Sequence, residues 1–96
     1  MLEPTELAAR AAELALVDRC RRGELGAFEE IYRAHSGKLY GLVLRMVGNA
    51  ADAEDLLQDI FLAAHRKLEG FRGESALGTR LYRLAMNQCL DHIRSR

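Results

Sequence analysis

The chain has 96 residues and a formal net charge of zero at pH 7, a size that suits one small domain. Hydrophobic residues make up 49% of the sequence and there is one proline, which excludes an intrinsically disordered chain. No secretory signal or bilayer-spanning hydrophobic run is evident, and Cys20 and Cys89 are too far apart for a disulfide framework or a zinc knuckle. We therefore expect a reduced, cytoplasmic protein with no metal, no cofactor and no membrane insertion.

The zero net charge conceals an uneven distribution of charge along the chain. Residues 1–65 carry seven basic and eleven acidic side chains, a balance of −4, whereas residues 66–96 carry seven basic and three acidic ones, a balance of +4. Such asymmetry is typical of a protein with two different partner surfaces. Two helices solvated by opposite charges would give the same totals, so composition alone does not decide between these interpretations.

Residues that favour helices dominate the first half of the chain. Pro4 suits the first position of a helix, and the alanine-rich stretch after it favours a helix that ends at Gly23, although its apolar face is poorly defined. A second helix is expected from about residue 24 to Val47, before Gly48. Its apolar residues recur at helical spacing: Leu25, Phe28, Ile31, Tyr32, Leu39, Leu42, Val43 and Met46.

Two further helices are expected in the second half. Asn49 is a good N-cap for a helix over residues 50–68, and Gly70 ends it. Its buried stripe is expected to consist of Ala53, Leu57, Ile60, Ala64 and Leu68. Ser75 is expected to cap a last helix that reaches Ser95. Because no alternating strand pattern occurs, the sequence predicts an all-α fold, a compact bundle of about four helices in one domain, with residues 1–22 as an N-terminal helix.

Acidic side chains gather on one face of the third expected helix. Asp52, Asp55 and Asp59 are spaced i, i+3 and i+7, so they share a face on which like charges repel one another. A basic partner that covered this face would relieve the repulsion, whereas the alternative is an ordinary solvated face. A calcium loop is a poor fit, because the glycine and the terminal glutamate of an EF-hand are missing from the pattern.

A polar stripe runs along the last expected helix, which is otherwise mostly apolar. The stripe consists of Arg80, Arg83, Asn87, Asp91 and Arg94. We expect it to be the only exposed face of this helix. Guanidinium groups suit phosphates, and an asparagine amide pairs with a base edge through two hydrogen bonds. The stripe therefore indicates nucleic-acid binding, with a merely solvated stripe as the alternative.

Two aromatic residues lie near this stripe in the sequence. Phe71 lies in a polar loop flanked by glycines, where it is available to stack on unpaired bases. Tyr82 lies among apolar residues of the last helix, so we expect it in the core.

The sequence gives little support for an enzyme. His35, His65 and His92 are isolated from one another, and no zinc-protease, nucleophile-elbow or phosphate-loop motif occurs. The acidic residues lie on helix faces rather than in a pair suited to acid–base catalysis.

Four motifs in order resemble region 2 of bacterial extracytoplasmic-function (ECF) sigma factors, over about residues 20–96. They are the segment Ala27–Tyr32, the acidic segment Asp52–Phe61, the loop Phe71–Ser75, and the stretch from Thr79 to Asn87 followed by Asp91–Arg94. Each motif alone is weak, but four in order with matching spacings are specific. The resemblance implies a sigma region 2 domain at residues 23–96 that acts in transcription initiation.

The resemblance implies three macromolecular partners. The second and third helices of such domains dock on the clamp helices of the RNA polymerase β′ subunit, and an anti-sigma factor is a further expected partner. The matching polymerase-binding positions in this chain are Asp52, Glu54, Asp55, Leu56, Gln58, Asp59 and Leu62.

The resemblance also implies that the loop after the third helix, together with the last helix, recognises and melts the promoter −10 element. A base of the non-template strand is expected to flip into a pocket, and Phe71 and Asn87 are at the positions that match the pocket residues of the family. Phosphate contacts are expected from the arginines, so the DNA-binding set is Phe71, Arg72, Arg80, Arg83, Asn87 and Arg94.

Two departures from the family pattern qualify this expectation. The residue after Thr79 is usually tryptophan in such proteins but is Arg80 here, so we expect promoter binding with weak melting. In such proteins a helix-turn-helix that reads the −35 element normally follows region 2. The sequence up to Arg96 contains none, as we would expect of an excised domain or a truncated form. The alternative function is therefore a sigma-like interaction module that binds polymerase or an anti-sigma factor without efficient melting.

Overall fold

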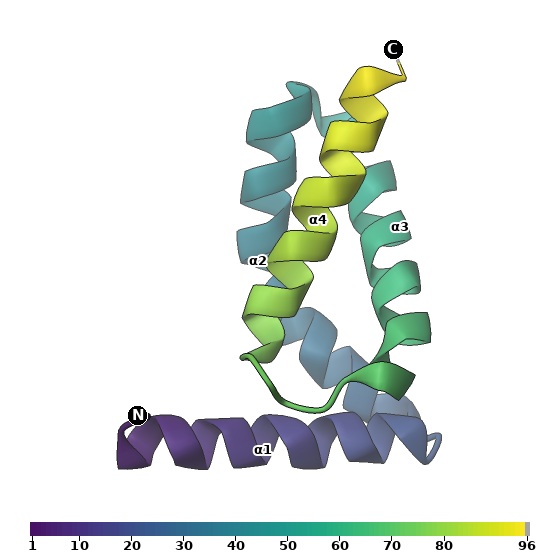
Figure 1. Ribbon diagram of the computed structural model, residues 1–96. Helices are drawn as coiled ribbons and strands as arrows, with labels where there is room; N and C mark the ends of the chain where they lie inside the picture. Colours follow the sequence, from purple (N-terminus) through teal and green to yellow (C-terminus); the bar gives the residue numbers. More distant parts are fainter. Residues whose placement is uncertain (96) are drawn as a thin grey trace.

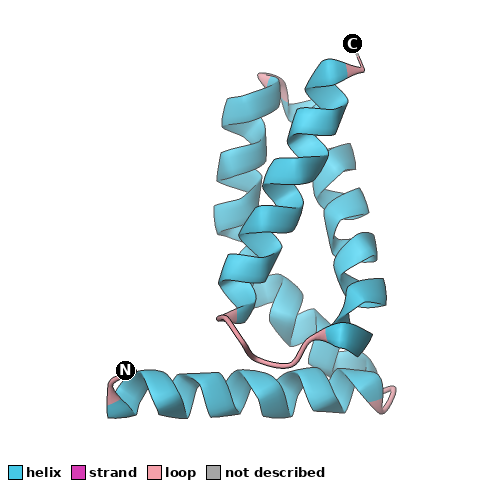
Figure 2. Cartoon of the chain, viewed as in Figure 1, coloured by secondary structure: helices cyan, strands magenta, loops and turns pink. Residues whose placement is uncertain are grey.

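A computed structural model describes residues 1–95. It consists of helices joined by short loops (Figures 1 and 2). The elements in chain order are α1 (Pro4–Arg21), α2 (Leu25–Val47), α3 (Ala50–Lys67), the short 3-10 helix η1 (Leu68–Gly70) and α4 (Leu77–Arg94). The helices α2, α3 and α4 lie alongside one another, and α1 lies across one end of the bundle they form. This arrangement confirms the expected all-α bundle.

The core lies between α2, α3 and α4, with Val17 of α1 closing one end. All five residues of the expected stripe on α3 are buried, which confirms the helical spacing used to predict it. On α2, two of the apolar residues that recur at helical spacing, Leu25 and Tyr32, are exposed. Leu25 is the first residue of α2 and lies beyond the packed part of the bundle. Among residues 1–95, no helix combines the length and hydrophobicity needed to cross a membrane.

The helix ends show how local chemistry sets the boundaries. The Asn49 side chain accepts a hydrogen bond from the backbone N–H of Asp52 at 2.9 Å, which confirms the predicted N-cap of α3. The prediction for α4 is wrong, because its N-cap is Ala76 rather than Ser75. The first backbone N–H of α4, on Leu77, instead donates to the Glu13 carboxylate of α1 at 3.1 Å. A side chain distant in sequence thus replaces the local cap.

Candidate functional site

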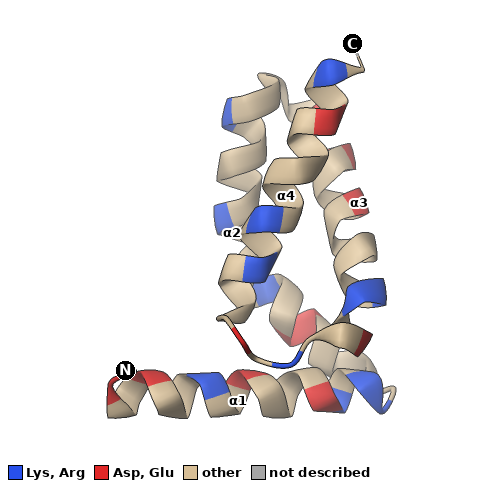
Figure 3. Ribbon diagram, in the orientation of Figure 1, with Lys and Arg blue, Asp and Glu red and all other residues tan. Residues whose placement is uncertain are grey.

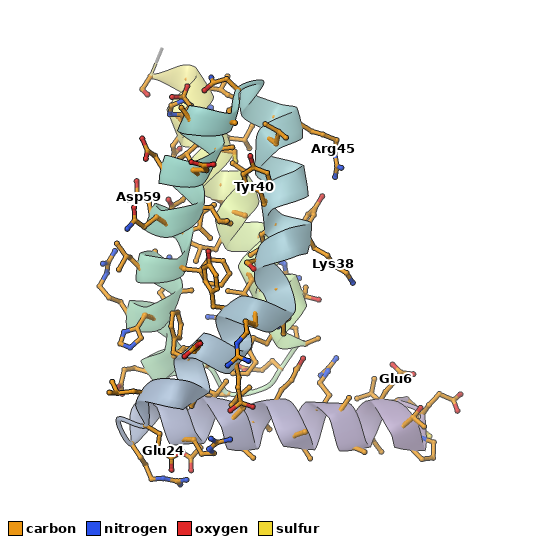
Figure 4. The ribbon with its side chains drawn as sticks, turned by 180° about the vertical axis from the view of Figure 1, so that it is seen from behind. Glu6, Glu24, Lys38, Tyr40, Arg45 and Asp59 are labelled. Atoms are coloured by element: carbon orange, nitrogen blue, oxygen red, sulfur yellow. The ribbon has the colours of Figure 1, made fainter. Side chains whose placement is uncertain are left out.

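An exposed, mostly acidic surface covers the outer side of α3. We call it the α3 face, and it consists of Glu54, Asp55, Gln58, Asp59 and Leu62, all exposed. Because the apolar stripe of α3 is buried in the bundle, these side chains face outward, as Asp59 does in Figure 4. Leu62, at the C-terminal end of this set, is 54% exposed. The face therefore offers negative charge with an apolar side chain at one end.

Two residues expected on this face have other positions. Leu56 is only 9% exposed and packs in the core, so it is unavailable for the direct partner contact expected of it. Asp52 is partly buried at the start of α3. Its carboxylate accepts a hydrogen bond from the Asn49 amide at 2.9 Å, and lies 3.7 Å from the ring of His92 on α4. The Asp52 carboxylate thus interacts with residues of its own fold.

The α3 face continues onto α2 through aromatic side chains. A hollow of about 410 Å³ lies between the two helices, bordered by Phe28, Tyr32, Phe61 and Leu62 among others. The ring centroids of Tyr32 and Phe61 are 4.7 Å apart, and Tyr32 keeps much of its surface exposed. Tyr32 recurs at helical spacing with residues of the core, and this spacing did not indicate that its side chain is exposed.

A pocket of about 300 Å³ lies where α3, η1 and α4 meet, and we call it the α4 pocket. Apolar side chains and polar ones both line it, and its ten residues are Ala64, Lys67, Leu68, Phe71, Leu77, Arg80, Leu81, Arg83, Leu84 and Asn87. Four members of the expected DNA-binding set thus come together around one pocket. Arg72 and Arg94 are exposed but do not line it.

The chemistry of the α4 pocket suits a flat, partly polar group. Its floor is apolar, while Arg80, Arg83 and Asn87 supply guanidinium and amide groups. The guanidinium carbon of Arg80 lies 5.6 Å from the centroid of the Phe71 ring, within cation–π range. Figure 3 shows basic segments of α4 toward the loop end and acidic segments on α3. Lys67 was not anticipated, although its place in the last turn of α3 next to the loop was a usable signal.

The burial of the two aromatic residues near the stripe is the reverse of what the sequence predicted. Phe71 is only 3% exposed and belongs to the core cluster, whereas Tyr82 is 50% exposed. On α4 the buried residues are Leu77, Leu81, Ala85 and Cys89, a narrow row at a spacing of four. Tyr82 falls outside this row. The polar stripe is therefore not the only exposed face of α4, which corrects the expectation.

Few ionisable groups have shifted pKa values. Burial raises the pKa of the Cys89 and Cys20 thiols, so both are protonated at neutral pH. Burial also lowers the pKa of His35, and this outweighs the opposing effect of the Glu13 carboxylate. Within the described part of the chain, no three His, Cys, Asp or Glu side chains gather as they would around a metal ion.

Comparison with known proteins defines the class. A family model described as Sigma-70 region 2 matches residues 31–96, so the chain belongs to that family. More particularly, it is a region 2 domain of the extracytoplasmic-function sigma factors.

Individual relatives agree with this assignment. The chain is 41% identical over 81 residues to the RNA polymerase sigma-H factor of Pseudomonas aeruginosa, covering 84% of this chain and 42% of that protein. It is 37% identical over 87 residues to the ECF RNA polymerase sigma-E factor of Haemophilus influenzae, covering 91% of this chain and 46% of that protein. The chain thus spans less than half the length of these relatives.

A solved structure is similar as well. It is the NMR structure of an engineered region 2 of sigmaE in complex with GTAAAA, with a TM-score of 0.77, 30% identity and 85% coverage of each chain.

Proposed function

We propose that this domain joins core RNA polymerase to the promoter −10 element through two separate surfaces, the α3 face and the α4 pocket. The observation that carries the proposal is the meeting of Phe71, Arg80, Arg83 and Asn87 around one pocket. The solved relative that binds GTAAAA supports the choice of an unpaired DNA strand as the ligand. The role is that of a transcription initiation factor domain, and its chemistry is binding without covalent steps.

In this proposal the α4 pocket captures one flipped base of the non-template strand. The apolar side chains of the pocket pack against the flat faces of the base, and the Asn87 amide forms hydrogen bonds with the edge of the base. Because Phe71 is buried, it forms the wall of the pocket rather than an open stacking surface. Flipping a base costs a few kcal/mol, which these contacts must offset. Arg83 at the pocket, with Arg72 and Arg94 outside it, provides charge for the neighbouring phosphates.

The α3 face is proposed to dock on the β′ clamp helices. Its carboxylates complement a basic partner, and Leu62 supplies an apolar contact at one end of the face. Asp52 contributes by holding the start of α3 through its hydrogen bonds with Asn49. Leu56 supports the face from within the core.

Oligonucleotide binding tests the DNA half of the proposal. Fluorescence anisotropy would measure the affinity of the domain for single-stranded GTAAAA and for versions with each base replaced in turn. We expect sequence-dependent binding that weakens steeply with salt. Asn87→Ala should lower affinity by about tenfold, because a bidentate contact is worth about 1–3 kcal/mol. Gln88→Ala is the matched control, since Gln88 is adjacent but does not line the pocket.

The same assay distinguishes the alternative function. If core polymerase binds the domain while no oligonucleotide of the series binds in a sequence-dependent way, the domain is an interaction module. Its resemblance to promoter-melting proteins would then be limited to the fold.

A further inference from the structure

The segment from η1 to the start of α4 carries Phe71 and lies along α1 (Figure 1). We call residues 68–77 the pocket loop, because Leu68, Phe71 and Leu77 all line the α4 pocket. This loop contains no regular structure between Gly70 and Leu77. Contacts from elsewhere therefore fix its shape: three of its side chains pack in the core, and α1 holds its backbone.

Arginines of α1 hold the carbonyl groups at the start of the pocket loop. Nε and Nη2 of Arg21 donate to the carbonyl oxygen of Leu68 at 3.1 and 2.9 Å, and Nη2 also donates to that of Phe71. Nη1 of Arg10 donates to the carbonyl oxygen of Gly73 at 3.4 Å. Hydrogen bonds from a charged donor are stronger than neutral ones. One guanidinium group thus fixes the backbone on both sides of the turn that leads into Phe71.

A carboxylate of α1 holds the other end of the pocket loop. Oε2 of Glu13 accepts the hydrogen bond from the backbone N–H of Leu77, at the N-terminus of α4. The N-cap residue of α4, Ala76, has no side chain that could do this. A negative charge is favourable at a helix N-terminus. Glu13 therefore also fixes the start of the helix that carries Arg80 and Asn87.

Packing between α1 and the loop is equally close. A Cβ atom added to Gly73 would lie 3.0 Å from the Leu14 side chain, and Val17 is fully buried. Leu16 and Cys20 of α1 also pack against the core. The residues that hold the loop, together with the buried Val17, recur at helical spacing, and they are Arg10, Glu13, Leu14, Val17 and Arg21. They form one face of α1, which we call the bracing face.

We propose that α1 is a brace that sets the geometry of the α4 pocket, with Arg21 and Glu13 as positioning residues for base capture. The inference rests on the proposed function, because the pocket is assigned there to a flipped base. It adds residues outside the Sigma-70 region 2 match, which begins at residue 31. Without the brace, the pocket loop loses the hydrogen bonds that order it, and part of the binding energy must then order the loop.

Arg21→Gln tests the brace, and Arg22→Gln is the matched control. Arg22 follows directly in sequence and is exposed, and it pairs only with Asp18 of its own helix. Both variants lose one positive charge. Hydrogen exchange of the amides of residues 70–76 and the affinity for single-stranded GTAAAA would be measured at a temperature where thermal unfolding shows all variants folded.

We expect Arg21→Gln to accelerate exchange in the pocket loop and to lower oligonucleotide affinity about tenfold, the factor that corresponds to about 1.4 kcal/mol. Exchange in the centre of α3 and binding to core polymerase should stay unchanged. The brace is refuted if the loop of Arg21→Gln exchanges at the same rate as that of Arg22→Gln. If even the unmodified domain binds no oligonucleotide, the proposed function fails, while loop exchange still decides on the brace.

Glu13 provides a second test that does not depend on Arg21. Glu13→Gln keeps an oxygen that accepts the Leu77 hydrogen bond, whereas Glu13→Ala removes it. We expect Glu13→Ala to increase amide exchange near Leu77 and to weaken oligonucleotide binding. Glu13→Gln should keep the exchange rate and the oligonucleotide affinity close to those of the unmodified domain. Equal behaviour of the two variants would overturn the positioning role of Glu13.

Discussion

Gly73 is the residue of the pocket loop at which backbone and side-chain constraints coincide. Its φ of 81° lies in the left-handed region, and a Cβ atom there would meet Leu14. We predict that Gly73→Ala lowers the free energy of unfolding by about 1–2 kcal/mol. Gly70→Ala is the control, because Gly70 has no positive φ and open space around it. Urea unfolding measures both, and equal stabilities of the two variants would contradict this account of the loop.

Arg80 lies at the position where the resemblance to ECF sigma factors leads us to expect a tryptophan. Its guanidinium group lies over Phe71, where it attracts phosphate but is a poor wedge between base pairs. We predict that Arg80→Trp increases the opening of a fluorescent −10 probe by core polymerase with this domain. Tyr82→Trp is the control, because Tyr82 is an exposed residue of α4 that does not line the α4 pocket. The hypothesis of weak melting is wrong if the probe opens equally well with Arg80 and with Trp.

Cys89 reports on the core at single-residue resolution. It is fully buried, and burial raises the pKa of its thiol, so little reactive thiolate forms at neutral pH. We predict that Cys89 in the Cys20→Ser variant reacts with a thiol reagent at least about a hundredfold more slowly in the folded than in the unfolded state. Rapid reaction of the folded variant at pH 7.5 would show that the core around Cys89 opens easily.

Residue-level burial was the least predictable part of the site. The polar, glycine-flanked surroundings of Phe71 indicated an exposed ring, but the ring packs in the core of the bundle. The apolar neighbours of Tyr82 indicated a buried ring, but the narrow buried row of α4 leaves it outside. In both cases the deciding contacts lie far away in sequence, and local composition does not contain them.

At the level of elements, α3 combines a buried row with an outer face in one helix. Its helical spacing predicted the buried row correctly, whereas Asp52, one of the three aspartates expected on the outer face, is partly buried. Leu56, which the resemblance assigned to the interface, is buried as well. Periodicity defines the centre of each side well but leaves the edge residues undetermined, because a small rotation of the helix changes their exposure.

The outer side of α3 gives a direct prediction for polymerase binding. We predict that Asp59→Lys lowers affinity for core polymerase at least about tenfold, because close charges of like sign across an interface cost several kcal/mol. Glu6→Lys on α1 is the matched control, since it makes the same charge change at an exposed position on a helix that takes no part in the α3 face. Biolayer interferometry measures both affinities. An unchanged affinity of Asp59→Lys would remove the α3 face from the interface.

The N-terminal cap of α3 supports the same element. We predict that Asn49→Ala lowers the free energy of unfolding by about 1 kcal/mol, because the N–H of Asp52 loses its acceptor. Asn49→Asp should retain most of the stability, since a carboxylate also accepts this bond. Thermal unfolding distinguishes the two, and equal losses would show that capping is not the role of Asn49.

For the whole molecule, stability should depend on pH through His35. Its pKa is lowered in the folded state from an ordinary value of 6.5, so the unfolded chain binds a proton more readily. The contribution of neutral His35 to the free energy of unfolding is therefore complete above pH 6.5, and it is lost as the pH falls toward the pKa of His35 in the folded state. We predict that the free energy of unfolding decreases below pH 6.5 and that His35→Asn makes this decrease smaller. Identical slopes in the two proteins would contradict the prediction.

The overall architecture was more accessible from the sequence than the placement of α1. Helix-forming residues, glycine stops and apolar spacing were sufficient to predict four helices and the core stripe of α3. The indistinct apolar face of α1 gave no direction for its packing. The reason is visible in the structure, since α1 contacts the pocket loop largely through polar groups, including Arg10, Glu13 and Arg21.

The central claim is that one small bundle connects a polymerase and an unpaired DNA strand. The most direct measurement is the amount of labelled single-stranded GTAAAA that co-migrates with core RNA polymerase on a native gel, above that seen without the domain. We predict that the domain brings the strand to the polymerase. Asn87→Ala should lower the amount of co-migrating strand through weaker strand binding, and Asp59→Lys through weaker polymerase binding. A strand that binds the domain but leaves it whenever polymerase binds would contradict the account.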